Sequence, residues 1–403
     1  MKIGLLRETK TPVDQRVILD PEQAAMLERQ YPDLEIRVQT SRDRAFSDKE
    51  YLEAGIKVVD DISDCDLLFG IKEAAIDTLL PGKNYVFFGH FAKRQAYNLP
   101  LLQALIKNKA TFSDYEYMVD ERGRRVCAFG WWAGIVGVYY TLRGYGLRTG
   151  LFSLPVADAN LTVDRIRQLL RSVDLPHVKM LLTGQGRVAR GAKYILQAIG
   201  AKIISVDEYL AVDNVDRFSC AFAYIDSLVR PRSGAGPVDV PEFHQHPERY
   251  ESDFLKFART TDILVCCHFW DPTAPVYLTR AHYRTPGFRI QMIGDITCDI
   301  DGSIQSTLRS STHKEPYYDY NPQTELEEPA FSSSRNVTVM AVDTCPNALP
   351  RETSHYFGEM LVEQVIRPML EKNESYVLSR ATILKEGRLT PRFSYLNDFA
   401  REQ

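Results

Sequence analysis

The sequence predicts an α/β protein made of two doubly wound parallel-sheet domains with a cleft between them. Short apolar runs of strand length alternate with segments of helical periodicity through most of the chain. The first series of runs is KIGLL, EIRVQT, CDLLFGI, YVFFG and ATFSD, and the second is VKMLLT, KIISV, DILVCC, RIQMIG and VTVMAV. Such alternation is typical of parallel sheets covered by helices, and two series need two sheets.

Length and composition agree with two domains. The chain has 403 residues, more than one typical hydrophobic core, with 44% apolar and 25% charged residues. AGIVGVYYTLRGYGL predicts a buried connecting helix, and SHYFGEMLVEQVIRPML predicts an amphipathic helix. With no further strand pattern, the tail is expected to pack back on the first domain. We therefore expect one domain at residues 1–135 plus 346–403 and another at 136–345.

Several classes of function are disfavoured by the composition. The formal net charge of −4 gives no electrostatic case for binding nucleic acid or an anionic membrane. No window approaches the roughly 18 uninterrupted apolar residues of a spanning helix, and the N-terminus lacks the order of a secretory signal. The seven cysteines lie mostly in apolar runs such as LVCCHF, which predicts reduced thiols in the cytoplasm. No cluster has metal-ligand spacing, so no structural metal is expected.

The stretch from Val178 to Asp207 has the order strand, glycine turn, helix, strand and acid. Gly184 permits a tight turn, Gly186 lets a pyrophosphate approach the helix N-terminus, and Ala189 is small enough for the helix to pack on the strand. Asp207, expected to end the second strand, follows Gly186 by 21 residues and suits an adenosine ribose. The stretch predicts a Rossmann-like dinucleotide-binding domain at 136–345, and a structural glycine turn is the alternative.

The acid at the ribose position favours NAD, because it repels the 2′-phosphate of NADP. The adjacent Glu208 supports NAD, whereas Lys202 and Arg187 leave room for a 2′-phosphate site. A further acid, Asp295, directly follows RIQMIG at the end of that predicted strand and is expected to face the nicotinamide, with a turn aspartate as the alternative. The predicted cofactor-binding residues are Gly184, Gly186, Arg187, Val188, Ala189, Asp207 and Asp295.

Ionisable residues follow three predicted strands of the first domain. Lys72 follows LLFGI, His90 follows YVFFG, and Glu116 comes shortly after ATFSD. Ligands of open α/β sheets bind beyond the carboxyl ends of the strands, so these side chains are expected to share one rim. A histidine, or a desolvated lysine, can exchange protons near neutral pH. The alternatives are a surface lysine and a half-buried histidine bound to a backbone carbonyl.

The chain resembles the lysine-ketoglutarate reductase and lysine-forming saccharopine dehydrogenase branch of the alanine dehydrogenase and transhydrogenase superfamily. The segments that carry this resemblance are LLRETK, GIKE, FFGH, DYEYMVDERGRRVCAFGWWAG, TGQGRVARGA, HPERY, GDITCDIDGSIQ and VDTCPNALPRETSHYFG. Several of them are most similar to the reductase domain of the bifunctional lysine-degrading enzyme. The chain ends without the second dehydrogenase domain of that enzyme, and a stand-alone reductase is therefore expected.

The resemblance implies a nicotinamide-dependent reaction that joins L-lysine and 2-oxoglutarate to form saccharopine, or the reverse. It implies that Lys72 and His90 are the acid–base pair and that Glu116 modulates their pKa values. Saccharopine carries three carboxylates, which need cations. The predicted substrate-binding residues are Lys10, Arg16, Arg124 and Arg125.

Two of these assignments have alternatives. Arg124 and Arg125 also suit a solvated hairpin turn in DERGRRV. Arg16 lies one residue further from Lys10 than the resemblance leads us to expect.

Three functions remain open at this stage. The first is the saccharopine reaction, with small molecules as the partners of a cytoplasmic monomer or small homo-oligomer. The second is a related amino-acid or opine dehydrogenase, such as an alanine dehydrogenase-like enzyme. The third is a non-catalytic dinucleotide-binding regulator, which the presence of Lys72, His90 and Glu116 argues against, because a regulator needs none of them.

Overall fold

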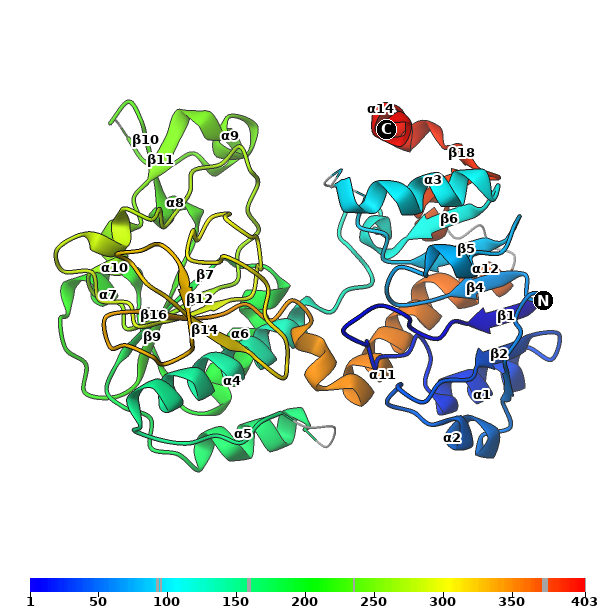
Figure 1. Cartoon of the computed structure of the whole chain (residues 1–403), viewed down its shortest axis with the longest axis horizontal. Helices are drawn as coiled ribbons and strands as arrows, with labels where there is room; N and C mark the ends of the chain where they lie inside the picture. Colours follow the sequence, from blue (N-terminus) through cyan, green and yellow to red (C-terminus); the bar gives the residue numbers. More distant parts are fainter. Residues whose placement is uncertain (92–93, 95, 158–160, 235, 372–375, 403) are drawn as a thin grey trace. The chain divides into compact units, whose positions relative to one another are not determined.

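Two compact units make up the computed structural model, which describes residues 1–91, 94, 96–157, 161–234, 236–371 and 376–402. Unit 1 comprises Met1–Phe129 and Leu349–Gln403, and unit 2 comprises Gly130–Ala348 (Figure 1). Each unit contains one eight-stranded sheet, and both sheets are mostly parallel. The predicted α/β class with two Rossmann-like sheets is confirmed.

The sheet of unit 1 has the strand order β18-β17-β6-β5-β4-β1-β2-β3. The strands from β3 to β6 are parallel, and they cross from one side of β1 to the other after β3. This is the order 3-2-1-4-5-6 of a doubly wound sheet. The strands are β1 (Lys2–Leu5), β2 (Glu35–Gln39), β3 (Lys57–Val59), β4 (Leu67–Phe69), β5 (Asn84–Phe87), β6 (Thr111–Asp114), β17 (Thr382–Lys385) and β18 (Arg388–Leu389).

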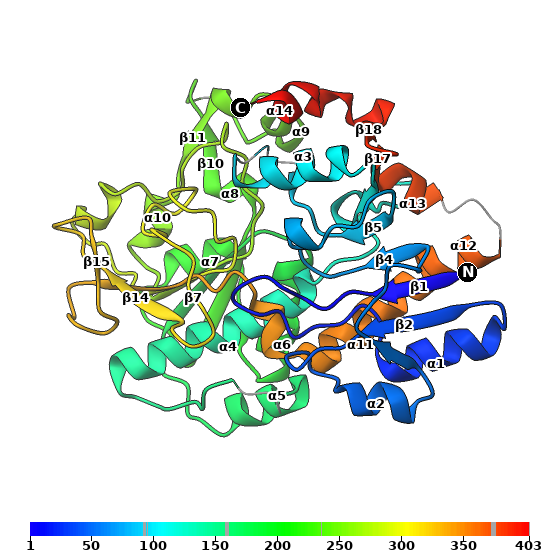
Figure 2. The ribbon, with the colours of Figure 1, turned by 45° about the vertical axis from the view of Figure 1, so that its right-hand side comes forward.

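The expectation that the tail contains no strand is wrong. β17 pairs antiparallel with β6 and with β18, and this hairpin extends the edge of the sheet. The two strands are four and two residues long, too short to show a periodic pattern in the sequence. The pairing still places the tail on unit 1, as expected, and both chain ends lie in that unit (Figure 2).

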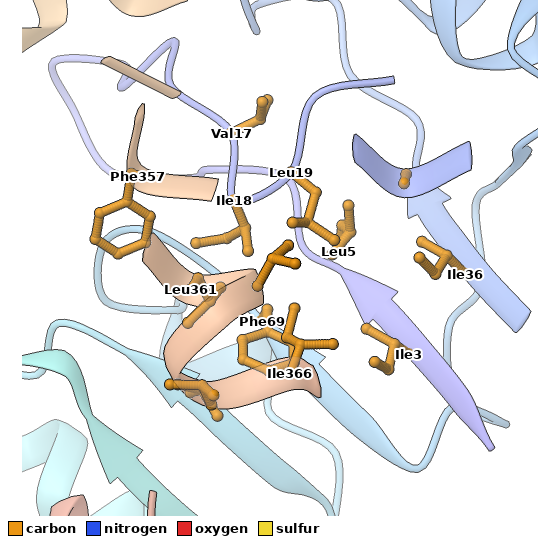
Figure 3. Packing of buried hydrophobic residues seen from close by; sticks show 14 of the residues in the cluster. Ile3, Leu5, Val17, Ile18, Leu19, Ile36, Phe69, Phe357, Leu361 and Ile366 are labelled. Atoms are coloured by element: carbon orange, nitrogen blue, oxygen red, sulfur yellow. The ribbon is translucent and has the colours of Figure 1, made fainter. Parts of the chain in front are cut away.

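The helix that begins at Pro350, with the π-helical turn after it, covers the sheet of unit 1. Figure 3 shows Phe357, Leu361 and Ile366 packed among side chains that include Ile3 and Phe69, all fully buried. Burial of each such side chain stabilises the fold by about 1.5–3 kcal/mol. The helices of unit 1 are α1 (Pro21–Gln30), α2 (Asp48–Glu53), α3 (Leu99–Lys107), α11 (Pro350–Leu361), α12 (Arg367–Leu370), α13 (Tyr376–Ala381) and α14 (Asn397–Arg401), with a π-helical turn at Val362–Ile366 between α11 and α12.

Local capping fixes where α1 begins. The Asp20 side chain accepts a hydrogen bond from the Gln23 backbone N–H at 2.8 Å, and the Gln23 side chain accepts one from the Asp20 N–H at 3.1 Å. Pro21 occupies the first helical position, where no N–H is needed. This reciprocal pair satisfies two backbone donors that the helix itself leaves without partners.

The sheet of unit 2 has the order β15-β14-β16-β13-β12-β7-β9-β8. β9 was not predicted, and it lies between β7 and β8. The strands are β7 (Lys179–Thr183), β8 (Lys202–Ile203), β9 (Ser219–Ala223), β12 (Ile263–Cys266), β13 (Met292–Asp295), β14 (Tyr317–Tyr320), β15 (Glu327–Glu328) and β16 (Val337–Met340). β10 (Val229–Pro231) and β11 (Tyr250–Ser252) form a separate antiparallel ribbon.

The predicted buried helix is α4 (Gly130–Thr149), which packs closely on α6 (Arg187–Ala198). A Cβ on Gly134 would overlap the Val188 carbonyl oxygen, and one on Gly191 would overlap that of Trp131. Both glycines are therefore required by packing. The other helices of unit 2 are α5 (Val163–Arg171), α7 (Val206–Ala211), α8 (Ile225–Leu228), α9 (Val240–Gln245) and α10 (Leu255–Ala258).

Within the described residues, no helix combines the length and the apolar character needed to cross a bilayer. In the same part of the chain no group of three or more His, Cys, Asp or Glu side chains is placed to hold a metal ion. Cys298 is half-buried, and the other cysteines are buried.

Candidate catalytic and cofactor sites

The three ionisable residues predicted in unit 1 follow adjacent strands of its sheet. β4, β5 and β6 are parallel neighbours, and Lys72, His90 and Glu116 come after their carboxyl ends. The pairing continues past the strand ends, because the Phe88 N–H donates to the Ile71 carbonyl oxygen at 3.0 Å. The structure thus brings the loops of Lys72 and His90 together.

His90 is held in an uncommon backbone conformation. Its φ angle is +54°, which is rare for a residue other than glycine, and the Asn98 side-chain amide donates to its carbonyl oxygen at 2.9 Å. The imidazole Nδ1 lies 3.3 Å from Glu116 Oε1, and the ring stacks on Phe88 with a centroid separation of 5.8 Å. The side chains of His90 and Glu116 are both partly exposed. A carboxylate against one ring nitrogen orients an imidazole for proton transfer at the other.

A buried acid that sequence reasoning missed joins these two loops. Asp114 is fully buried at the end of β6 and accepts hydrogen bonds from the Gly89 N–H at 3.0 Å and the Glu116 N–H at 2.8 Å. Burial, with the nearby charge of Glu116, raises the pKa of Asp114 to about 7. Its position as the last residue of ATFSD was the available signal, since strand ends point toward the site.

Glu8 holds the backbone of the Lys72 loop in the way that Asp114 holds the loops of His90 and Glu116. Its carboxyl group accepts hydrogen bonds from the Ile71 N–H at 2.6 Å and the Lys72 N–H at 2.9 Å. Burial, reinforced by the charge of Asp14, raises the pKa of Glu8 to about 8. Each loop that carries a candidate acid–base group is therefore fixed by a carboxyl group that accepts two backbone N–H donors.

The predicted substrate-binding cations divide into two groups. Arg16 is 4% exposed, bonded to Asp14 through Nε at 2.8 Å and Nη2 at 2.5 Å, and its guanidinium lies 4.1 Å from the Phe129 ring centroid. Burial alone would raise the pKa of Asp14, but Arg16 outweighs it and the pKa lies below its usual value. Lys10 pairs with Glu73, next to Lys72, at 2.8 Å. Lys10 thus lies near the Lys72 loop, and the charge of Arg16 acts on Glu8, whose carboxyl group accepts from the Lys72 N–H.

Arg124 and Arg125 lie in a hairpin turn. Arg124 bonds to Asp120 through Nε at 2.8 Å, its side chain is 68% exposed, and Arg125 pairs in an isolated bridge with Val119. This is the geometry of the alternative interpretation, a solvated turn. Their binding of substrate stays a prediction.

Because Glu8 has a raised pKa, it should make stability depend on pH. The folded state holds this proton over the range between the usual value, 4.5, and about 8, whereas the unfolded chain has lost it. The contribution is fully present below the unfolded pKa and is lost as the pH rises through the folded one. We expect the free energy of unfolding to fall between about pH 5 and pH 8.5, and to fall less in Glu8→Gln. Denaturant titrations at both pH values measure this.

The matched control is Glu53→Gln, whose side chain is 65% exposed. It should keep the pH dependence of the wild type. An unchanged pH dependence in Glu8→Gln would contradict a proton on Glu8 in the folded state.

Unit 2 contains a pocket of about 470 Å³ at the carboxyl ends of four of its strands. Its lining includes the turn Gly184–Val188 after β7, Tyr224 and Ile225 after β9, residues 267–269 after β12, and Ile296 and Thr297 after β13. Ligand pockets in proteins commonly have about 300–1,000 Å³. The size and the position suit a dinucleotide.

The two glycines of the turn differ in what requires them. Gly184 has φ +87°, and a Cβ there would lie 2.8 Å from the His268 Cα and 2.9 Å from the Cys267 oxygen, so the fold requires glycine. Gly186 caps α6 with φ −72°, which any residue adopts, and a Cβ would meet no atom within 4 Å. Nothing in the fold therefore requires glycine at 186, whereas a phosphate at the helix N-terminus would.

The predicted position of Asp207 at the end of a strand is wrong. β8 ends at Ile203, and Asp207 lies exposed in the first turn of α7, whose N-cap Ser205 accepts a hydrogen bond from the Glu208 N–H at 3.1 Å. The helix begins here because Ser205 supplies an N-cap, so the strand ends before the apolar run IISV does. Asp207 does not line the pocket.

Asp295 ends β13 as predicted, but it is fully buried. Oδ1 accepts hydrogen bonds from the Thr297 N–H at 3.0 Å and hydroxyl at 2.6 Å, and Oδ2 accepts one from the Thr307 hydroxyl at 2.6 Å. Burial raises its pKa. The geometry is that of the alternative, a turn aspartate, which positions Thr297 at the pocket.

Replacing Asp295 should therefore act on stability first. Asp295→Ala removes the acceptor of three donors, and a buried donor without a partner costs about 1–3 kcal/mol. We expect denaturant unfolding to show a loss of this order, and Asp295→Asn to lose less because it keeps one oxygen. A variant with unchanged stability and lost cofactor affinity would instead show that the carboxylate meets the ligand.

His268 is a pocket residue that sequence reasoning missed. Its Nδ1 lies 2.6 Å from the Thr183 hydroxyl and its Nε2 lies 2.8 Å from the Ser303 hydroxyl, so both ring nitrogens are engaged. Burial lowers its pKa to about 3, which keeps the ring neutral. Because its backbone packs on Gly184, His268 braces the glycine turn.

Comparisons with known proteins agree with this arrangement. Residues 4–136 match the family model "Alanine dehydrogenase/PNT, N-terminal domain". The chain is 29% identical to the alpha-aminoadipic semialdehyde synthase of Arabidopsis thaliana, over 98% of its own length and 41% of that protein. It is 22% identical to the saccharopine dehydrogenase [NAD(+), L-lysine-forming] of Emericella nidulans, over 91% of its own length and 92% of that protein.

The chain is thus similar to saccharopine dehydrogenases and to aminoadipic semialdehyde synthases, and residues 4–136 match the N-terminal domain of the alanine dehydrogenase and transhydrogenase family. The fold is similar to that of a solved L-alanine dehydrogenase, which superimposes with a TM-score of 0.65 at 17% identity and covers 99% of this chain and all of that one. The chain spans about two fifths of the length of the Arabidopsis relative.

Proposed function

We propose that the chain is a nicotinamide-dependent oxidoreductase that interconverts saccharopine with L-lysine and 2-oxoglutarate. The observation that carries the proposal is the placement of Lys72 and the His90–Glu116 pair after three adjacent parallel strands. Unit 2 supports it with a glycine turn whose residue 186 is free of any packing requirement. The relatives named above include an aminoadipic semialdehyde synthase and a lysine-forming saccharopine dehydrogenase.

The residues of unit 1 match the proton transfers of the reaction. To join the substrates, the amine nitrogen of lysine attacks the oxo carbon and loses a proton, while the carbonyl oxygen gains one. The carbinolamine then loses water to give a substrate imine, and this step again needs a proton on the leaving oxygen. Two groups that exchange protons suit these alternating steps better than one. Lys72 and His90 have this role in the proposal, and Glu116 orients the imidazole at Nδ1.

The turn Gly184–Val188 in unit 2 would hold the cofactor pyrophosphate at the N-terminus of α6. When bound, a nicotinamide cofactor supplies the hydride that reduces the imine carbon. In the proposal the cofactor is NAD, and the only other partners are the amino acid and the oxo acid. A cytoplasmic monomer or small homo-oligomer stays a prediction.

The test is the oxidation of NADH and NADPH in the presence of a panel of amines with 2-oxoglutarate or pyruvate. We expect oxidation that depends on both L-lysine and 2-oxoglutarate and gives saccharopine. Turnover only with another amine or with pyruvate would favour a related amino-acid or opine dehydrogenase. Cofactor binding without amine-dependent oxidation would favour the regulator.

A further inference from the structure

β9 is a direct neighbour of β7 in the sheet and lies on the side opposite to β12. The two strands pair in parallel from Lys179 opposite Ser219 to Thr183 opposite Ala223. The pairing continues into the glycine turn, because the Gly184 N–H donates to the Ala223 carbonyl oxygen at 2.9 Å. The residues that follow Ala223 therefore flank the turn that would hold the pyrophosphate.

β8 lies one strand further out. Among the strands of the described residues it pairs with β9 alone, and its last residue, Ile203, lies opposite Cys220, so β8 ends before β9 does. Neighbouring strands are about 4.8 Å apart, which places the end of β8 roughly 10 Å from β7. In sheets where the second strand of the motif adjoins the first, its terminal acid reaches the adenosine ribose. Here that neighbouring position belongs to the end of β9.

The pocket lining agrees with the strand order. Tyr224 and Ile225 line the pocket and Asp226 directly follows them, although neither Asp226 nor Asp207 is itself a lining residue. Tyr224 is 37% exposed, and Phe269, which follows the other neighbour of β7, lines the same pocket and is 81% exposed. Two exposed aromatic rings on either side of the strand β7 suit the flat faces of an adenine base.

We propose that Tyr224 and Asp226, rather than Asp207, meet the adenosine ribose, and that Asp226 makes the chain prefer NAD to NADP. This inference rests on the proposed function. Asp226 is exposed in the first turn of α8, and in the described part of the chain its carboxylate has one hydrogen bond, from the Ser227 hydroxyl at 3.3 Å. A carboxylate accepts hydrogen bonds from ribose hydroxyls and repels a 2′-phosphate.

The experiment measures the affinity of the full chain for NADH and for NADPH by fluorescence titration, without substrates. Asp226→Asn should weaken NADH binding roughly ten-fold or more, since hydrogen bonds to a charged group are the strong ones. NADPH binding should stay the same or tighten, because a repulsive charge is gone. The matched control, Asp207→Asn, should change neither affinity by more than about two-fold.

Three results would overturn the inference: loss of NADH affinity in Asp207→Asn with none in Asp226→Asn, equal weakening of both cofactors in Asp226→Asn, or no change in either variant. Both side chains are exposed, so equal thermal midpoints should show that both variants fold. A wild-type chain that binds neither cofactor would defeat the proposed function as well. A wild type that oxidises NADH with lysine and 2-oxoglutarate while Asp226→Asn binds it normally would defeat only the present inference.

Discussion

Lys72→Met and His90→Gln should each lower turnover with lysine, 2-oxoglutarate and NADH by about 10²–10⁴-fold, the usual contribution of a positioned acid–base group. The two loops are joined by the hydrogen bond from Phe88 to Ile71, and His90 has Glu116 at 3.3 Å to orient it. Binding of NADH should persist in both variants, because the predicted cofactor residues belong to unit 2. Steady-state kinetics combined with fluorescence titration of NADH separates the two effects.

The double variant should lose less than the product of the single losses, because two groups that serve the same proton transfers act as a unit. A useful control is Lys83→Met: this partly buried lysine of unit 1 donates to the Cys65 carbonyl oxygen and belongs to neither candidate site. A folded His90→Gln protein with near-normal turnover would remove the histidine from the mechanism. If neither variant changes amine-dependent oxidation, the regulator becomes the better interpretation.

The positions of the acid–base candidates could be predicted because they depend on local patterns. Strong apolar runs such as YVFFG locate a parallel strand, and the residue after it faces the ligand edge whatever the rest of the sheet does. His90 and Lys72 follow their strands in this way. Their supporting acids could not be inferred so directly. Glu8 and Asp114 matter because tertiary packing places their carboxyl groups against backbone N–H groups of other loops, and a sequence does not display that contact.

The strand order of unit 2 is the clearest case of a nonlocal property. FSCAFAY contains two phenylalanines and a tyrosine among small residues, which is compatible with a strand, but nothing in that pattern indicates that β9 lies beside β7. The spacing from Gly186 to an acid then points to Asp207, which the structure places in α7. Spacing along the chain measures connection length, whereas recognition of the ribose depends on which strand is the neighbour in space.

Gly186→Val should abolish measurable binding of NADH and NADPH while leaving the thermal midpoint of the protein nearly unchanged. The φ angle of −72° is accessible to valine, and a Cβ at this position meets no atom within 4 Å apart from the adjacent residues, so the side chain starts in open space. A bound pyrophosphate would need that same space at the N-terminus of α6. Gly184→Val is the matched comparison: its positive φ and the contacts with Cys267 and His268 predict a loss of stability. Differential scanning fluorimetry with and without cofactor distinguishes the two variants, and unchanged cofactor affinity in a folded Gly186→Val protein would show that the pyrophosphate does not bind at this turn.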